Sequence, residues 1–281
     1  MISLKDCKGP AEALERIGNA RYRKVPVLYR NGDSDPFQYQ GKAVVLCEND
    51  DGVLPVSTVG CDYGLLQPIH KLEMAYDIAE HHGGFVKGYT SFRGGKITTI
   101  EIGFNEEKPV GPDHVRLGFR LKDSYDGTGS ATLDGLAWVK VCSNGMMGWG
   151  WKSRIAVPHR AFVHSRMTEA LRASGYVSNK LKEILEHMNK LSETPLADEA
   201  AKELVKELIP GDGTRSDNIR QDITDRIFGG IGAETRRGTA WGFYNGITEY
   251  TTHVLGGKSE AMAKIGAGVT LERRALTLLG V

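Results

Sequence analysis

The pattern of apolar and polar positions changes about half way along this chain of 281 residues. Before residue 136 the apolar residues fall in short runs that are typical of β-strands, and after Pro158 they recur at the three-to-four-residue spacing of amphipathic helices. We therefore expect an α+β fold, with an antiparallel β-hairpin sheet packed with helices and followed by a helical C-terminal half.

Turn residues divide the first part into hairpins. Runs 42–48 and 53–59 are separated by Asn49-Asp50-Asp51-Gly52, which is hairpin-turn chemistry. A helix is predicted from Pro68 to the Gly83-Gly84 pair, where it should stop. Four further strands are predicted, in two consecutive hairpins, over residues 85–92, 96–104, 115–122 and 131–142.

The second part predicts helices over residues 161–174, 178–191, 195–210, 216–228, 239–255 and 259–279. We expect residues 1–160 to form a β-rich core with at least one packed helix. Residues 161–281 should form a helical region packed on the same core.

The composition is that of an ordinary globular protein, with 40% hydrophobic and 25% charged residues. No apolar run approaches the roughly 20 residues that span a bilayer, so we expect no membrane partner and a cytoplasmic location. The four cysteines are scattered, which predicts reduced thiols and neither disulfides nor a zinc knuckle.

Charge is strongly segregated, although the net charge is only +1. Residues 136–180 carry +6 and residues 181–235 carry −5. The basic segment also holds aromatic residues, and cations interleaved with flat rings suit a phosphate backbone with unpaired bases. Its bases and aromatic residues are Lys140, Lys152, Arg154, Arg160, Arg166, Arg172, Lys180, Trp138, Trp149, Trp151, Phe162 and Tyr176.

Two hairpin loops add polar groups. Arg93-Gly94-Gly95-Lys96 offers two cations and unhindered backbone amides to a phosphate. The loop that holds Asp126-Gly127 is mainly turn-forming, although Tyr125 could stack on a base. His159 beside Arg160 fits a phosphate contact about as well as a metal site, because His159 and His164 are five residues apart and no cysteine pair accompanies them.

The sequence signals for an enzymatic site are weaker than those for nucleic-acid binding. Gly256-Gly257-Lys258-Ser259 resembles the end of a phosphate-binding loop, but Thr252 stands where that motif needs glycine, so we expect a helix stop and no ATP or other cofactor. Asn245, Glu249 and His253 would share one helical face. Buried interhelical hydrogen bonds explain that stripe better than hydrolysis does.

Five segments together resemble a phage and plasmid-like family that is defined only as a domain of unknown function, number nine hundred and thirty-two. They are residues 83–88, 123–127, 139–146, 159–164 and 239–250, and the resemblance covers roughly residues 60–279. It implies an origin in a phage or mobile element. At the level of the fold, a helix followed by two antiparallel hairpins and a helix is similar to the core of the Rad fifty-two superfamily of single-strand annealing proteins. That second resemblance implies rings or helical arcs that bind single-stranded DNA in a basic groove without ATP.

The sequence therefore predicts an oligomeric, ATP-independent protein that binds and anneals single-stranded DNA in phage-type recombination, with a phage exonuclease as a candidate partner, and that is not an enzyme. The residues expected to contact the nucleic acid are Arg93, Lys96, Lys140, Trp149, Trp151, Lys152, Arg154, His159, Arg160 and Arg166. Two alternatives stay open: an assembly module whose +6 segment docks on the −5 segment of a neighbour, and a hydrolase that uses Glu249 and His253.

Overall fold

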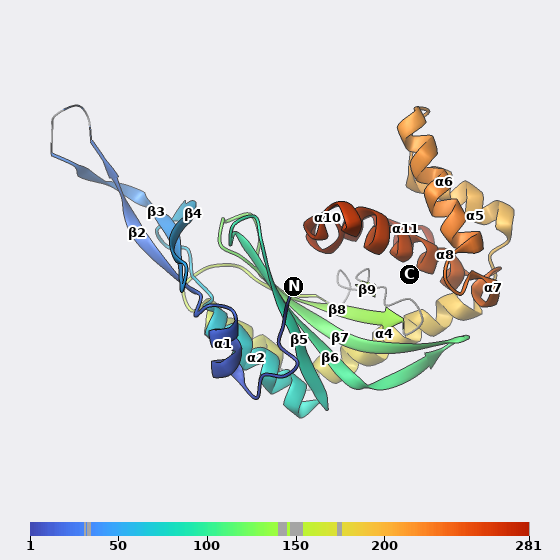
Figure 1. Ribbon diagram of the computed structural model, residues 1–281, viewed down its shortest axis with the longest axis horizontal. Coiled ribbons are helices and arrows are strands. Elements are labelled where there is room, and N and C mark those ends of the chain that lie inside the picture. Colours follow the sequence, from blue (N-terminus) through green and yellow to red (C-terminus); the bar gives the residue numbers. More distant parts are fainter. Residues whose placement is uncertain (31, 33–34, 140–144, 147–153, 173–175, 281) are drawn as a thin grey trace. The chain divides into compact units, whose positions relative to one another are not determined.

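The computed structural model describes residues 1–30, 32, 35–139, 145–146, 154–172 and 176–280 (Figure 1). The fold is α+β, as the sequence predicts, with antiparallel strand pairs in the first part and helices in the C-terminal half. In the part of the chain that the structure describes, no helix is both long and apolar enough to cross a membrane.

The strands form two sheets. The larger sheet has the order β1-β5-β6-β7-β8-β10, and β9 pairs with β8. The smaller sheet has the order β2-β3-β4. The strands are β1 (Ile2–Ser3), β2 (Arg21–Tyr29), β3 (Phe37–Asn49), β4 (Gly52–Gly60), β5 (Gly84–Phe92), β6 (Ile97–Val110), β7 (Asp113–Ser124), β8 (Ala131–Val139), β9 (Gly145–Met146) and β10 (Ile155–Val157).

The helices follow the predicted periodicity, with three differences, the first of which is that the helix predicted over 259–279 divides into two at Gly266. The helices are α1 (Pro10–Arg16), α2 (Pro68–His81), α3 (Val163–Arg172), α4 (Tyr176–Glu193), α5 (Asp198–Leu208), α6 (Thr214–Gly229), α7 (Ala233–Arg236), α8 (Ala240–Glu249), the π-helix Tyr250–Leu255, α9 (Gly256–Lys258), α10 (Glu260–Ile265) and α11 (Ala267–Leu278). The helix predicted over 239–255 changes to π geometry at Tyr250, and it continues through Gly256 and Gly257 instead of stopping there. The break falls at Ser259, whose backbone is extended.

The predicted hairpins are confirmed, and most of their strands are longer than the sequence indicates. The strand predicted over 131–142 is described as β8 up to Val139, and residues 140–142 lie outside the described residues. The turn at residues 49–52 joins β3 to β4 in the register Asn49↔Gly52, and β5 pairs with β6 from Gly84↔Phe104 to Phe92↔Ile97. The chain before residue 42, for which the hydrophobic pattern predicts no element, adds β1, α1, β2 and the first residues of β3.

The chain folds into two compact units whose segments interleave. Unit 1 comprises Met1–Asn105, Phe119–Asp134 and Arg154–Tyr176, and unit 2 comprises Glu106–Gly118, Gly135–Ser153 and Val177–Val281. Strands β6, β7 and β8 each begin in one unit and end in the other. The division expected at residue 160 coincides with neither set of boundaries, because these long strands contribute residues to both units.

Each unit has its own buried side chains. In unit 1, α2 packs on β5, and one hydrophobic cluster joins the base of the smaller sheet to the loop after β7. That cluster consists of Tyr22, Val45, Cys47, Val56, Val59 and Tyr125, with Tyr63 and Leu65 packed against it. In unit 2, Trp138 packs against Leu136 and Val269, and α8 is buried from Ala240 to Thr248.

Candidate nucleic-acid interface

A buried ion cluster lies in unit 1 where β7 ends. It consists of Lys71 from α2, Asp123 from the end of β7 and His159 from the segment after β10. The Lys71 Nζ atom lies 3.3 Å from Asp123 Oδ2, and the His159 Nε2 atom lies 3.0 Å from Asp123 Oδ1. Lys71 also donates a hydrogen bond to the hydroxyl of Thr98 on β6. Four segments that are distant in the sequence therefore meet in this cluster, three of them at the Asp123 carboxylate.

Burial controls the chemistry of this cluster. Asp123 is 0%, Lys71 2% and His159 8% exposed. Burial lowers the pKa of Lys71 against the opposing effect of Asp123. Burial alone would raise the pKa of Asp123, but Lys71 and His159 outweigh it and hold that pKa below its ordinary value. These side chains are closed to a substrate, so their role is to fix the segments that carry them.

Aromatic rings enclose the cluster. Tyr125 stacks on Tyr22 with ring centroids 3.5 Å apart, and Tyr63 stacks on the imidazole of His159 at 4.5 Å. The ammonium of Lys71 lies 4.9 Å from the centre of the Tyr125 ring. The Tyr125 hydroxyl donates to the backbone oxygen of Leu66 at 2.7 Å, and burial raises the pKa of this hydroxyl well above its ordinary value.

This geometry corrects two expectations from the sequence. Tyr125 is 0% exposed and already stacked, so it cannot stack on a base. His159 is buried, and its two ring nitrogens face the backbone oxygen of Gly64 and the carboxylate of Asp123. It is therefore not free to contact a phosphate, although it positions the residues that follow it.

A surface segment, Arg160–Arg166, begins directly after His159. The His159 Nδ1 atom lies 2.8 Å from Gly64 O, and the backbone nitrogen of Gly64 donates to the His159 oxygen at 3.2 Å. A Cβ atom at position 64 would lie 2.1 Å from the Arg160 oxygen, so only glycine fits there. The backbone at the start of the surface segment is thus held by the buried cluster.

The surface segment presents one aromatic ring and two cations. Phe162 is 80% exposed and has a left-handed backbone with φ +60°. Arg160 and Arg166 are exposed, and the backbone nitrogen of Arg166 donates to the Phe162 oxygen at 3.0 Å where α3 begins. A bulky residue rarely adopts a positive φ, and such strain persists only where the surrounding structure enforces it. An exposed, strained phenylalanine between two arginines is the feature expected of a stacking platform for a base.

The loop Arg93–Lys96 borders the same buried cluster. The backbone nitrogen of Tyr125 donates to the Lys96 oxygen at 2.7 Å, and the Tyr22 hydroxyl donates to the Gly95 oxygen at 2.8 Å. Arg93 is exposed with φ +53°, and Lys96 is half-buried. The structure therefore connects the two predicted cationic segments, 93–96 and 159–166, through Tyr125 and Asp123.

The other predicted contact residues divide into two groups. Arg154 is half-buried, and its Nε donates a hydrogen bond to the buried carboxylate of Asp134 at 2.6 Å. This bond occupies one N–H group of the guanidinium. The remaining ones lie outside the described residues: Lys140, Trp149, Trp151 and Lys152.

An open groove of about 560 Å³ lies between α2 and α3 in unit 1. His164 lines it and stacks on His70 with ring centroids 4.1 Å apart, while His159 belongs to the buried cluster. The two histidines that are five residues apart in the sequence thus have different surroundings. The other residues that line the groove are Glu73, Met74, Asp77, Ser165, Thr168, Glu169 and Arg172. Its three carboxylates against one arginine make it unsuited to phosphate.

A second buried ion cluster lies in unit 2 and consists of Arg236, Asp113 and Trp241, of which Trp241 belongs to the segment 239–250 of the family resemblance. Arg236 donates to both oxygens of Asp113 at 2.6 and 2.7 Å, and the Trp241 indole donates to the same carboxylate at 2.8 Å. This bidentate pair is almost completely buried and ties α7 and α8 to the start of β7. The segment is therefore structural.

The polar stripe on α8 does not assemble into a catalytic site. Asn245 donates to the Trp241 oxygen of its own helix at 2.9 Å, and Glu249 accepts from the backbone nitrogen of Ile231 at 3.1 Å. His253 lies within the π-helix, whose wider turn changes the face on which it stands. Asn245 and Glu249 thus each hydrogen-bond to backbone within unit 2, which agrees with a structural role for the stripe.

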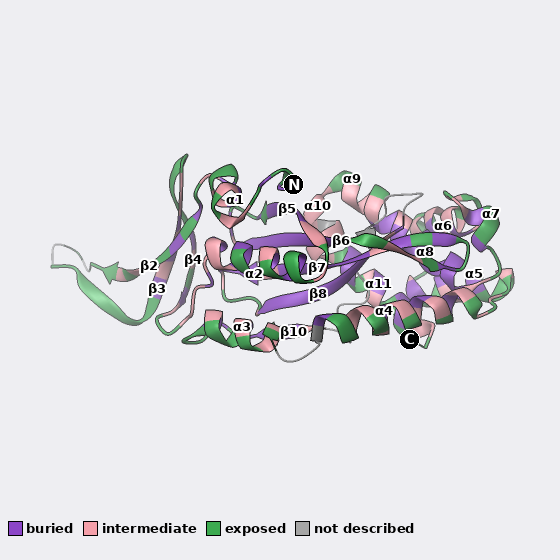
Figure 2. Cartoon of the chain, turned by 90° about the horizontal axis from the view of Figure 1, so that it is seen from below, coloured by how far each residue is buried: buried purple, intermediate pink, exposed green. Residues whose placement is uncertain are grey.

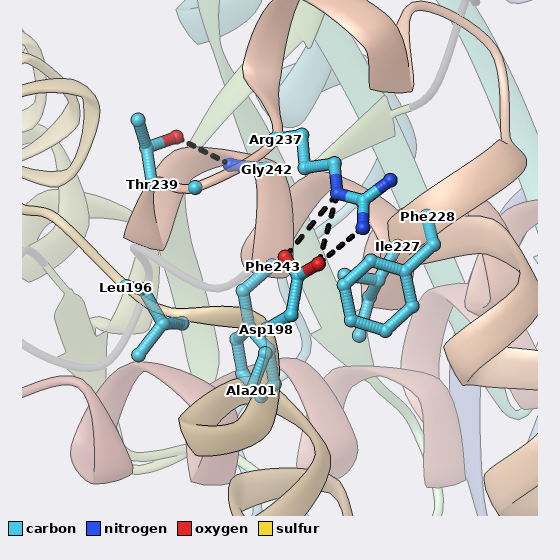
Figure 3. Close-up of a pocket in the computed structure, with 10 residues that line it drawn as sticks. Leu196, Asp198, Ala201, Ile227, Phe228, Arg237, Thr239, Gly242 and Phe243 are labelled. Atoms are coloured by element: carbon cyan, nitrogen blue, oxygen red, sulfur yellow. Dashed lines mark hydrogen bonds and ion pairs between the residues drawn. The ribbon is translucent and has the colours of Figure 1, made fainter.

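A pocket beside α8 is too small to bind a substrate. Figure 3 shows Arg237 and Asp198 forming an ion pair over its mouth, with Phe228 beside the guanidinium. Its volume is about 10 Å³, which is the room that a single water molecule needs.

Two signals in the sequence could have located the buried clusters. Lys71 occupies an otherwise apolar face of α2, and Asp113 is the first residue of β7, two residues before the alternating apolar positions Val115, Leu117 and Phe119. Charged residues in such positions need buried partners, but the sequence alone does not identify those partners.

The sequence matches one known protein family over most of its length. Residues 55–273 match the family model described as Domain of unknown function (DUF932), so the chain belongs to that family. No curated protein and no solved structure matches the chain. The similarity to the Rad fifty-two superfamily consequently remains an expectation from the sequence.

Proposed function

We propose that this protein binds single-stranded DNA and anneals it to a complementary strand without ATP, in recombination of the phage type. The observation that carries the proposal is the surface segment Arg160–Arg166, in which Phe162 is 80% exposed and flanked by two exposed arginines. Stacking on a side chain tolerates any base, and arginine neutralises the adjacent phosphates.

The buried ion cluster supports the proposal because it holds this segment before any ligand arrives. Arg160 follows His159 directly, and the His159 ring is held by Asp123, Gly64 and Tyr63. A platform that is already ordered loses less conformational entropy when it binds. Such a protein needs no bond-making side chain, because an extended strand with exposed base edges pairs more readily with its complement.

The first test measures binding of a fluorescent single-stranded oligonucleotide by anisotropy at several salt concentrations. The charge reversal Arg160→Glu with Arg166→Glu should weaken binding and reduce the salt slope by about 1.4, since each phosphate contact with a single strand contributes roughly 0.7. A matched control, Arg215→Glu with Lys258→Glu, changes the net charge equally at two exposed cations of unit 2. Equal losses in both variants, or no binding by the wild type at low salt, would overturn the proposal.

Phe162 has a different expected signature. Phe162→Ala should weaken binding by about 1–3 kcal/mol, the contribution of one stacked base, and should leave the salt slope unchanged. Phe162→Trp should retain the affinity. Annealing of complementary oligonucleotides, followed by fluorescence quenching, should slow in the alanine variant at subsaturating protein. Unchanged affinity in that variant would contradict the assignment.

An assembly role is the second candidate function. It is favoured by a separate observation, the exposed apolar residues of the β2–β3 hairpin. The two functions are compatible, since an annealing protein can also be an oligomer.

A further inference from the structure

The distal part of the β2–β3 hairpin is a two-stranded ribbon with an exposed surface on both faces. We call residues 28–41 the arm. Strand β4 pairs with β3 only from Lys42 to Asn49, so the arm lacks a third strand. Its described residues, 28–30, 32 and 35–41, are all exposed. Figure 1 shows β2 and β3 continuing beyond the end of β4, and Figure 2 shows the described residues of this part in the exposed colour.

The exposed side chains of the arm are large and apolar. Leu28 is 65% exposed, while Tyr29, Phe37 and Tyr39 are each 52–53% exposed. Tyr29 and Phe37 are register partners on opposite strands, and their rings meet edge to face at 5.2 Å. A two-stranded hairpin is only marginally stable in water, and exposed apolar patches of this kind mark interaction surfaces.

The charge of the arm decides which class of partner fits. Residues 28–41 contain one base, Arg30, and two acids, Asp33 and Asp35, which gives a net charge of −1. A polyanion is therefore disfavoured, and two copies of the arm would repel each other little. Interface cores are enriched in Tyr and Phe and depleted of Lys and Glu, which matches this composition.

The arm of a second copy offers the best-matching surface. Among the described residues, the other exposed large apolar side chains are Met1, Ile2, Val53, Leu54, Phe162 and Ile231, which lie singly or in adjacent pairs. Within the described part of the chain, only the arm combines three exposed rings with Leu28 and with an open strand edge at β3 residues 37–40. Two arms related by a twofold axis would present the same patch to each other, as closed dimers do.

The available area suits a contact of moderate strength. Three half-exposed rings of roughly 150–250 Å² each, together with Leu28, provide roughly 300–400 Å² per copy. A stable interface buries about 800 Å² per partner, so the side chains supply nearly half and the strand backbones and glutamines must supply the rest. We propose that the arm is a self-association surface through which two copies of this chain pair, arm against arm. This inference does not depend on nucleic-acid binding.

Sedimentation velocity of the full chain without nucleic acid tests the proposal. The wild type should associate in a concentration-dependent manner between about 1 and 100 µM, as expected for an interface at the small end of the range. The triple variant Tyr29→Ser, Phe37→Ser, Tyr39→Ser should associate at least about 100-fold more weakly, since truncated aromatic residues often dominate binding. Its thermal unfolding should be unchanged, because these side chains are exposed.

The control is Val53→Ser with Leu54→Ser, which removes exposed apolar residues from the same sheet at the β3–β4 turn and should leave association unaltered. A second measurement uses Gln38→Cys in a Cys61→Ser, Cys142→Ser background, where a short bis-maleimide should join two copies through position 38. A monomeric wild type, or a triple variant that associates as strongly as the wild type, would overturn the inference. So would a triple variant that associates normally but binds the oligonucleotide more weakly, since the arm would then contact nucleic acid.

Discussion

Two buried ion clusters include residues from three of the segments that carry the family resemblance, namely Asp123, His159 and Trp241. Asp123 and Asp113 each collect a cation and an aromatic donor or ring, and each lies at one end of β7. A buried carboxylate is tolerated only when its charge is compensated, and the compensation fixes which distant segments meet. Residue identity at these positions therefore specifies tertiary arrangement more than chemistry.

The Asp123 cluster makes a stability prediction. Asp123→Asn should lower the free energy of unfolding by about 3–5 kcal/mol, because it leaves Lys71 charged and buried without a counter-ion. Adding Lys71→Met should recover more than half of that loss, since the double variant removes both charges. Urea denaturation of the four proteins in the cycle measures the coupling.

The exposed ion pair between Lys206 and Glu203 on α5 provides the control. Lys206→Met should cost less than about 1 kcal/mol, because solvent screens that pair. A loss in Asp123→Asn no larger than in this control would show that the buried cluster contributes little.

At the scale of elements, the packing of helices in unit 2 depends on how closely their backbones approach. Gly246 of α8 faces α6, and a Cβ atom there would lie 2.7 Å from the backbone nitrogen of Ile227 and 2.8 Å from its Cα. Backbone atoms cannot yield as flexible side chains do. The absence of a side chain at position 246 is therefore what permits α6 and α8 to pack.

We expect Gly246→Ala to destabilise the protein by about 1–3 kcal/mol, the usual cost of overpacking, despite the higher helix propensity of alanine. Gly257→Ala is the matched control: Gly257 lies within α9, and nothing stands within 4 Å of a Cβ atom there. That substitution should leave stability unchanged or raise it by up to about 1 kcal/mol. Thermal denaturation followed by circular dichroism distinguishes the two, and equal behaviour would contradict the packing argument.

At the scale of the whole molecule, the interleaved units mean that the chain cannot be divided at the point where its pattern changes. Unit 2 needs residues 106–118, which lie far before the helical part of the sequence. Those residues include Asp113, the partner of both Arg236 and Trp241. The helices are contiguous in the sequence, but their buried polar groups are satisfied by a strand that precedes them.

The fragment 161–281 should therefore fail to form a cooperative structure by itself. Trp241 is its only tryptophan, so near-ultraviolet circular dichroism reports directly on the environment of that indole. We expect no near-ultraviolet signal and a broad urea transition for the isolated fragment, and recovery of both when fragment 1–160 is co-expressed. A native tryptophan signal in the isolated fragment would contradict this expectation.

Local patterns determined the element types of this protein. Alternation and turn residues located β4 to β8, and helical spacing located α2 and most helices after residue 160, because these signals depend only on neighbouring side chains. The basic character of the segment around Arg160 was equally visible, since charge is a property of composition.

Tertiary structure alone decided which polar residues are available for function. Tyr125 and His159 are as polar in sequence as Arg160, yet packing against Tyr22, Tyr63 and Asp123 removes both of them from the surface. Phe162 and the arm are likewise exposed because no other segment of the described chain packs over them. Burial is set by contacts between distant segments, whereas periodicity is set within one segment, and for that reason the sequence predicted the fold class but not the surface that the fold presents.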